Sequence, residues 1–127
     1  MQSFCVEFSG REGIDVEFSA QKEPASVREE VALCLYRVTQ ESLRNVARHS
    51  GAKSVSVSLK RAGGALHLSI QDRGKGFDVR PDRAGEGLGL LSMNERVRLV
   101  HGTFQVRSRA GHGTRIEVRV PVSPKSR

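Results

Sequence analysis

The sequence is poor in aromatic residues and in cysteine. It contains no tryptophan, and aromatic residues make up only 5% of its 127 residues, so the core must rest on Val, Leu and Ile. Two cysteines, Cys5 and Cys34, are too few for a disulfide framework or a zinc site, and we expect reduced thiols in a cytoplasmic setting. No apolar run is long enough to cross a bilayer and no signal-peptide pattern is present. We therefore expect no membrane contact by this domain, and an anchor of a membrane-bound parent would lie elsewhere.

Acidic residues are outnumbered, with 21 Lys and Arg against 14 Asp and Glu, for a formal net charge of +7. This balance is compatible with nucleic acids, acidic partners or phosphate ligands. The basic residues are scattered, which favours a solvated surface. A basic module that binds nucleic acid without chemistry is an alternative, but it needs aromatic stacking positions that one Tyr and five Phe do not provide. We therefore expect no nucleic-acid partner.

Hydrophobic periodicity predicts a single α/β domain. Alternating residues predict strands at 14–20, 53–60 and 65–72, around Phe104 and Val106, and from Thr114 to Val120. Helical spacing predicts helices at 2–10, from Val27 to about Ser50, and from Leu90 to Gly102. The expected ends of these elements are Ser26 as an N-cap, Gly51 as a C-cap and Gly63-Gly64 as a hairpin turn. Together they predict a two-layer α/β sandwich with a mixed sheet covered on one face by helices.

A carboxylate ends one of the apolar rows. In ALHLSIQDRGKGFD, residues 65–78, Leu66, Leu68 and Ile70 alternate with polar residues, and Asp72 comes next on the apolar side. A carboxylate in that position needs hydrogen-bond donors. It is either a turn-capping residue bonded to its own glycine-rich loop or an acceptor for a ligand amine.

Two further motifs are candidates for a site. Glu41, Asn45 and His49, spaced i, i+4 and i+8, form a polar stripe that faces either water or a ligand. The loop GEGLG at 85–89 leads into the helix from Leu90, whose N-terminus favours phosphate. A Rossmann loop is excluded because no strand precedes it, and the lysine–serine pair of a Walker motif is missing.

The order E-x-x-x-N-x-x-x-H, D-x-G-x-G, G-x-G-x-G and G-T resembles the GHKL family of ATP-binding domains. More closely, QESLRNVARHS, DRGKGFD, GEGLGLLSMNERV and GHGTRIEVRVP are similar to the ATP-binding catalytic domain of bacterial sensor histidine kinases. The short lid and the LLSMNERV helix resemble the subgroup paired with helix-turn-helix response regulators. The resemblance implies one Bergerat-type ATP-binding domain over 1–127, in which 1–12 ends a connecting helix and 122–127 is a flexible tail.

The resemblance implies roles for the residues around the adenine. Asp72 accepts a hydrogen bond from the exocyclic amine. Thr114 lies beside it, bonded to Asp72 or to a shared water. Gly74 and Gly76 let the backbone pass close to the purine.

It also implies roles near the phosphates. Asn45 coordinates Mg²⁺ through its amide oxygen, and Glu41 supports catalysis by holding a metal-bound water or polarising the acceptor. Arg48 lies near the phosphates and His49 beside the ribose and phosphates. The backbone that wraps the phosphates belongs to Gly85, Gly87, Leu88 and Gly89, and residues 78–86 form the lid.

The implied function is to bind Mg²⁺-ATP and to donate its γ-phosphoryl group to a histidine on a separate dimerisation and phosphoacceptor domain of the same parent kinase. The downstream partner is then a response regulator of a two-component system. The acceptor is absent from this chain, because its four histidines, His49, His67, His101 and His112, are in the wrong places for that role. The alternative within the GHKL group is a serine kinase of an anti-sigma regulatory system.

Overall fold

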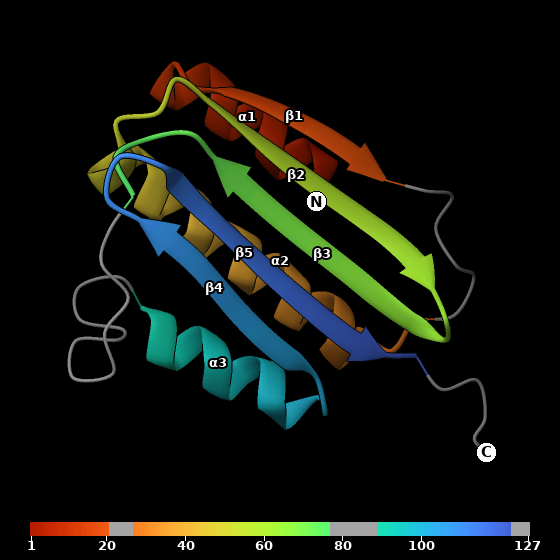
Figure 1. The fold of residues 1–127 in the computed structure, drawn as a ribbon. Helices are drawn as coiled ribbons and strands as arrows, with labels where there is room; N and C mark the ends of the chain where they lie inside the picture. The colour runs from red at the N-terminus through yellow and green to blue at the C-terminus, as the bar shows by residue number, and fades with distance from the viewer. Residues whose placement is uncertain (21–26, 77–88, 123–127) are drawn as a thin grey trace.

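The structure is a computed structural model that describes residues 1–20, 27–76 and 89–122. The helices are α1 (Gln2–Glu12), α2 (Glu29–Asn45) and α3 (Leu90–Leu99), and α2 continues into a π-helical turn, η1 (Val46–Ser50). The strands are β1 (Asp15–Ala20), β2 (Ser54–Ala62), β3 (Ala65–Asp72), β4 (Thr103–Arg109) and β5 (Gly113–Pro121). Helices and strands follow one another in the predicted order (Figure 1).

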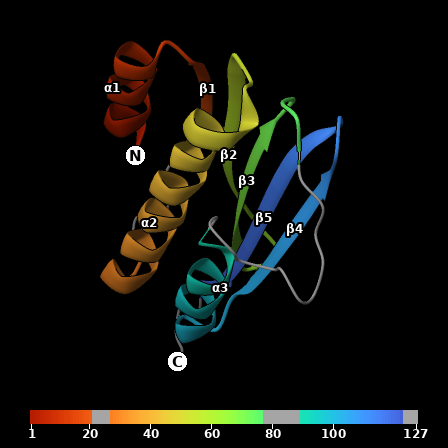
Figure 2. The same ribbon diagram turned by 90° about the vertical axis from the view of Figure 1, so that its left-hand side faces the viewer.

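The strands form one mixed sheet in the order β1-β2-β3-β5-β4. β1 pairs with β2 in parallel, and the other neighbouring strands pair antiparallel. Figure 2 shows α1, α2 and α3 on one side of this sheet, while its other face is open. The predicted two-layer sandwich is therefore confirmed.

The core lies between the sheet and the helices, where the predicted apolar rows meet. On β3, Leu66, Leu68 and Ile70 are buried. Gln71, which lies between the buried residues Ile70 and Asp72, is exposed. The helices contribute their apolar stripes, which comprise Val31, Cys34, Leu35, Val38 and Leu43 of α2 and Leu90, Met93 and Val97 of α3. The apolar residues at the helical period of 3.6 and those at the strand period of two thus pack into the same core.

Cys5 and Cys34 are free thiols and both are buried. Burial raises the pKa of each thiol because the thiolate would lose its hydration. They therefore pack as small apolar side chains. Within the described residues, no helix is long and apolar enough to cross a membrane.

The predicted turns are present. Gly63 and Gly64 have φ angles of 59° and 73°, and Ala62 pairs with Ala65 on either side of them. Positive φ at both central residues is typical of the type I′ turn that joins two antiparallel strands. Gly51 ends the helical segment in the left-handed conformation, as expected for a C-cap.

Two predicted boundaries differ from the structure. The N-cap of α2 is Arg28, without a side-chain cap hydrogen bond, and the expected N-cap Ser26 lies outside the described residues. Val122, which we predicted in the flexible tail, is 7% exposed and donates its backbone N–H to Gly64 O at 2.9 Å. Its apolar side chain joins the core, so the tail cannot begin at residue 122. Residues 123–127 lie outside the described part.

Candidate functional site

Asp72 is the buried carboxylate around which the candidate site is built. It ends β3 on the helix-covered face and is only 6% exposed. Its Cα partners across the sheet are Val55 of β2 and Thr114 of β5. The position predicted from the apolar row is therefore confirmed.

Two donors hold one oxygen of this carboxylate. Ser50 Oγ donates to Asp72 Oδ1 at 2.9 Å, and the backbone N–H of Gly74 donates to the same oxygen at 2.8 Å. No described residue donates to Oδ2. Both interpretations of Asp72 thus find support, because its own loop caps Oδ1 while Oδ2 is left to accept from another donor.

Ser50 reaches Asp72 because the end of the long helix is wound as a π-helix. α2 ends at Asn45, and η1 carries the chain through Ser50 to the left-handed Gly51. Ser50 is buried, its Oγ accepts from the N–H of Ala52 at 3.1 Å, and its carbonyl accepts from the N–H of Lys75 at 2.8 Å. Single π-turns inside helices are frequent at functional sites.

Sequence reasoning missed Ser50. A signal was available, because Ser50 lies four residues after the buried Val46 and so continues the apolar stripe of the helix. It is the helical counterpart of Asp72, a polar residue at the end of an apolar row. Two such residues at the ends of neighbouring elements indicate a buried hydrogen bond.

Gly74 and Gly76 allow close backbone approaches at this end of the sheet. A Cβ on Gly74 would collide with the side chain and carbonyl of Ser50, and one on Gly76 would collide with the carbonyl of Arg109. Gly76 also has a φ of 67°. Both glycines therefore bring the loop after β3 against its neighbours, and their predicted approach to a purine stays a prediction.

Thr114 lies beside Asp72 in the sheet, but its hydroxyl has another partner. Thr114 Oγ1 is 2.8 Å from Ser108 Oγ, and Ser108 Oγ donates to the carbonyl of Gly113 at 3.1 Å. Either hydroxyl can be the donor in the contact between Thr114 and Ser108. The structure gives the Thr114 hydroxyl this partner rather than Asp72, and the predicted direct bond to Asp72 stays a prediction. The route through a shared water stays a prediction.

Glu41 lies against the N-terminus of α3. It is half-buried, its Oε1 is 3.1 Å from Arg44 Nη1, and a Cβ on Gly89 would lie 3.0 Å from its Oε2. Gly89 is the N-cap of α3, with a φ of 67° and no side-chain cap hydrogen bond. Among the described residues, no side chain caps the first N–H groups of α3, and the carboxylate of Glu41 lies next to Gly89.

Asn45 is half-buried one turn after Glu41 on α2. Its amide oxygen and the neighbouring carboxylate are hard ligands of the kind that Mg²⁺ accepts. Among the described residues no group of three or more His, Cys, Asp or Glu side chains forms a metal cluster.

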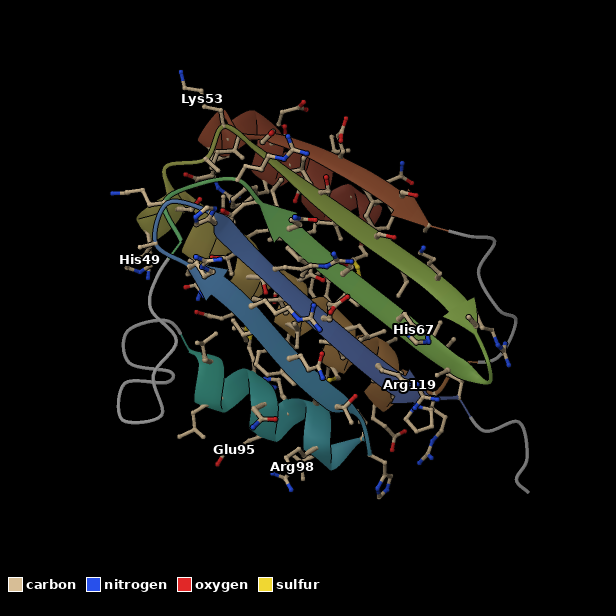
Figure 3. The ribbon with its side chains drawn as sticks, viewed as in Figure 1. His49, Lys53, His67, Glu95, Arg98 and Arg119 are labelled. Atoms are coloured by element: carbon tan, nitrogen blue, oxygen red, sulfur yellow. The ribbon has the colours of Figure 1, made fainter. Side chains whose placement is uncertain are left out.

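The last two helix residues of the predicted site, Arg48 and His49, are both exposed. His49 is exposed, and Figure 3 shows its side chain at the outer end of the molecule. Arg48 is also exposed and lines a cavity of about 240 Å³ together with Phe4, Phe8 and Arg11 of α1. Both residues lie in the π-turn η1, beyond the end of α2 at Asn45. The roles of Arg48 and His49 near a ligand stay predictions.

The predicted phosphate loop is described only at its end. Gly85, Gly87, Leu88 and the predicted lid 78–86 lie outside the described residues. Gly89 lies at the start of α3, where the sequence placed it.

Comparisons with known proteins agree with this geometry. Residues 30–124 match the family model for histidine kinase-, DNA gyrase B-, and HSP90-like ATPases. The chain is 39% identical over 121 residues to the sensor histidine kinase LiaS of Bacillus subtilis (strain 168), and 34% identical over 122 residues to the oxygen sensor histidine kinase NreB of Staphylococcus carnosus (strain TM300). These matches cover 95% and 96% of this chain but only 33% and 35% of the relatives, so the chain spans about a third of their length.

Solved structures share the fold. The histidine kinase domain of the blue-light activated kinase EL346 from Erythrobacter litoralis aligns with a TM-score of 0.73 at 20% identity, covering 96% of this chain and 59% of that one. The histidine kinase AdeS from Acinetobacter baumannii aligns with a TM-score of 0.70 at 18% identity, covering 95% and 60%. At such low identity the likeness concerns the fold alone.

Proposed function

Because this chain belongs to the family of histidine kinase-, DNA gyrase B-, and HSP90-like ATPases, we propose that it is the part of a sensor histidine kinase that binds Mg²⁺-ATP and presents the γ-phosphoryl group for transfer to a histidine. The acceptor histidine would lie on a dimerisation domain of the same parent kinase, and a response regulator would receive the phosphoryl group next. The two relatives named as sensor histidine kinases favour this over the serine kinase alternative.

The observation that carries the proposal is the asymmetric carboxylate of Asp72. Ser50 and Gly74 both donate to Oδ1, which fixes the plane of the carboxylate and directs Oδ2 away from these donors. Adenine presents an exocyclic N–H₂ donor that a fixed acceptor can recognise. The fit is chemical, since a carboxylate oxygen of the buried Asp72 that has no donor among the described residues can accept a hydrogen bond from a ligand.

The N-terminus of α3 supplies the second half of the proposed site. The N–H groups of a helix start and the helix dipole favour phosphate oxygens, and Gly89 at this start has no side chain. Asn45 would hold Mg²⁺, which when bound neutralises the phosphate charge. Glu41, beside Gly89, would position a water on the metal or orient the acceptor. Phosphoryl transfer depends mainly on such positioning and charge neutralisation.

Titration with a fluorescent ATP analogue, with and without Mg²⁺, tests this proposal. Asp72→Asn should weaken all adenine nucleotides by about 10-fold or more, because the amide can turn a donor toward the amine and a hydrogen bond to a charged group is lost. Asn45→Ala should instead abolish the Mg²⁺-dependent part of the binding and leave the remainder. Gln71→Ala is a matched control, because Gln71 precedes Asp72 and is exposed on the opposite face. If both site variants titrate like the wild type, the proposed site is wrong.

A further inference from the structure

The open face of the sheet carries a concentration of basic side chains over β3, β5, β4 and the end of β2. Its members, which we term the basic face, are Lys60, His67, Arg107, Arg109, Arg115 and Arg119. Figure 3 views the molecule from this side and shows His67 and Arg119 on the sheet, away from the helices. The basic face thus lies on the opposite side of the sheet from Asp72 and is separate from the candidate nucleotide site.

Strand register places like charges directly opposite one another on this face. Arg107 of β4 is the Cα partner of Arg115 of β5, and His67 lies between Lys60 on one side and Arg119 on the other. Like charges directly opposite on one face destabilise a sheet. The fold therefore tolerates a local repulsion that a bound anion would relieve.

The described residues do not neutralise this charge. Glu117 is the acidic residue in the middle of the basic face, and it forms an ion pair with Arg115 at 3.2 Å. No described residue forms an ion pair with Lys60, Arg107 or Arg119. Three cations are thus exposed beside a single carboxylate that is already paired.

Between these cations the surface is hollowed. An open cavity of about 440 Å³ has Lys60, His67, Arg115 and Arg119 on its walls. The neutral polar side chains in the lining are Ser58, Ser69, Thr103 and Gln105, and the lining is completed by Glu117, Ala62, Leu68 and Val118. Cations interleaved with hydroxyl and amide donors can bind carboxylates, because each ionised oxygen accepts several hydrogen bonds.

The basic face ends at acidic residues on the same side of the sheet. Asp15 and Glu17 are exposed on β1, and Glu17 pairs with Ser56, which in turn pairs with Gln71. This row of paired residues continues from Gln71 to Arg115 of β5 and Arg107 of β4, so it runs from a carboxylate at one end to two arginines at the other. An extended polyanion such as a nucleic acid would run over these carboxylates, which would repel it. The basic face also offers no aromatic side chain for base stacking.

We propose that the basic face is a docking surface for an acidic element of a partner protein. Three neighbouring strands are about 10 Å across, which matches the width of one α-helix or two strands of a partner. Discrete carboxylates of such an element can pair with Arg107 and Arg119 on either side of the Arg115–Glu117 pair. Because Asp72 lies on the other face, the partner and a nucleotide can bind at the same time.

Binding of a fluorescein-labelled peptide of Glu-Ala-Ala-Glu repeats tests the proposal by fluorescence anisotropy. The double variant Arg107→Gln/Arg119→Gln should weaken binding of the peptide by about 10-fold, which corresponds to about 1.4 kcal/mol for the loss of two exposed charge pairs. The matched control is Arg37→Gln/Arg98→Gln, which removes the same charge from exposed positions on α2 and α3 and should change binding by less than about 2-fold. Figure 3 shows Arg98 on α3, outside the sheet.

Three results would overturn the proposal. They are the absence of saturable peptide binding, an equal loss in both double variants, and tighter binding of a DNA duplex than of the peptide with the same dependence on Arg107 and Arg119. Amide shifts in a ¹⁵N-labelled sample provide an independent check, because the peptide should perturb Ser69 and Gln105 and leave the helices unchanged. Perturbations confined to the helical layer would likewise reject the basic face.

Discussion

At the scale of single residues, the candidate site depends on a hydrogen bond between two polar side chains that each continue an apolar row. Asp72 was predictable because the strand alternation is strict and short, so its orientation follows from sequence. Ser50 was not predicted: its position after Val46 was a signal that it is buried, but its contact with Asp72 depends on how the π-turn packs against the end of β3. The contact of Thr114 with Ser108 was also not predicted, since Ser108 is a neighbour only through the strand order.

Replacing Ser50 by alanine tests whether this hydroxyl positions the carboxylate. We expect adenine nucleotides to bind about 5- to 10-fold more weakly, because Oδ1 loses one of its two donors and Asp72 gains freedom to rotate. The preference for ATP over purine riboside triphosphate, which lacks the amine, should shrink as well. Competition titrations with the two nucleotides measure that ratio.

Ser42→Ala is the control for the Ser50 variant. Ser42 is a buried serine on the same helix, but its hydroxyl contacts Met93 Sδ at 3.6 Å, on a different helix. It should leave the preference between the two nucleotides unchanged. An unchanged preference in Ser50→Ala would reduce Ser50 to a purely structural residue.

At the scale of elements, periodicity located the helices and strands, and turn glycines located the hairpin. The ends of elements were less predictable, because they are decided by tertiary contacts. Val122 shows this, since its burial and its bond to Gly64 extend the ordered chain beyond Pro121. The strand order, which places β5 between β3 and β4, was also beyond the reach of local patterns.

Replacing either of two glycines in different elements by alanine should change the free energy of unfolding, in opposite directions for the two. Gly64→Ala places a side chain at a φ of 73° in the hairpin and should lower the free energy of unfolding by about 1–2 kcal/mol. Gly10→Ala lies within α1 with open space around it, and should raise the free energy of unfolding by about 0.5–1 kcal/mol. Urea unfolding followed by circular dichroism measures both. A stabilised Gly64→Ala variant would contradict the hairpin geometry.

At the scale of the whole molecule, the sheet separates two surfaces. The helix-covered face holds Asp72 and the start of α3, whereas the open face holds the basic residues. The first was accessible from sequence because its residues form compact motifs. The second was not, because its cations come from three strands and gather only through the register.

The position of the histidines predicts that this chain does not phosphorylate itself. His67 lies on the open face of the sheet, opposite to Asp72, and His112 lies in the turn between β4 and β5. Incubation with ATP labelled at the γ-phosphate should therefore leave no alkali-stable, acid-labile label on the protein, while slow release of phosphate continues. Stable label on any of the four histidines would contradict this expectation.

The two donors on Asp72 Oδ1 also have a consequence for the choice among nucleobases. Guanine presents the carbonyl oxygen O6 where adenine presents its amine. With the carboxylate held in one orientation, that oxygen would meet Oδ2 with no proton between them, and the two acceptors would repel. We therefore expect GTP to be rejected by electrostatic mismatch rather than by size. The two hydrogen bonds that orient Asp72 would thus exclude the other abundant purine triphosphate of a cell.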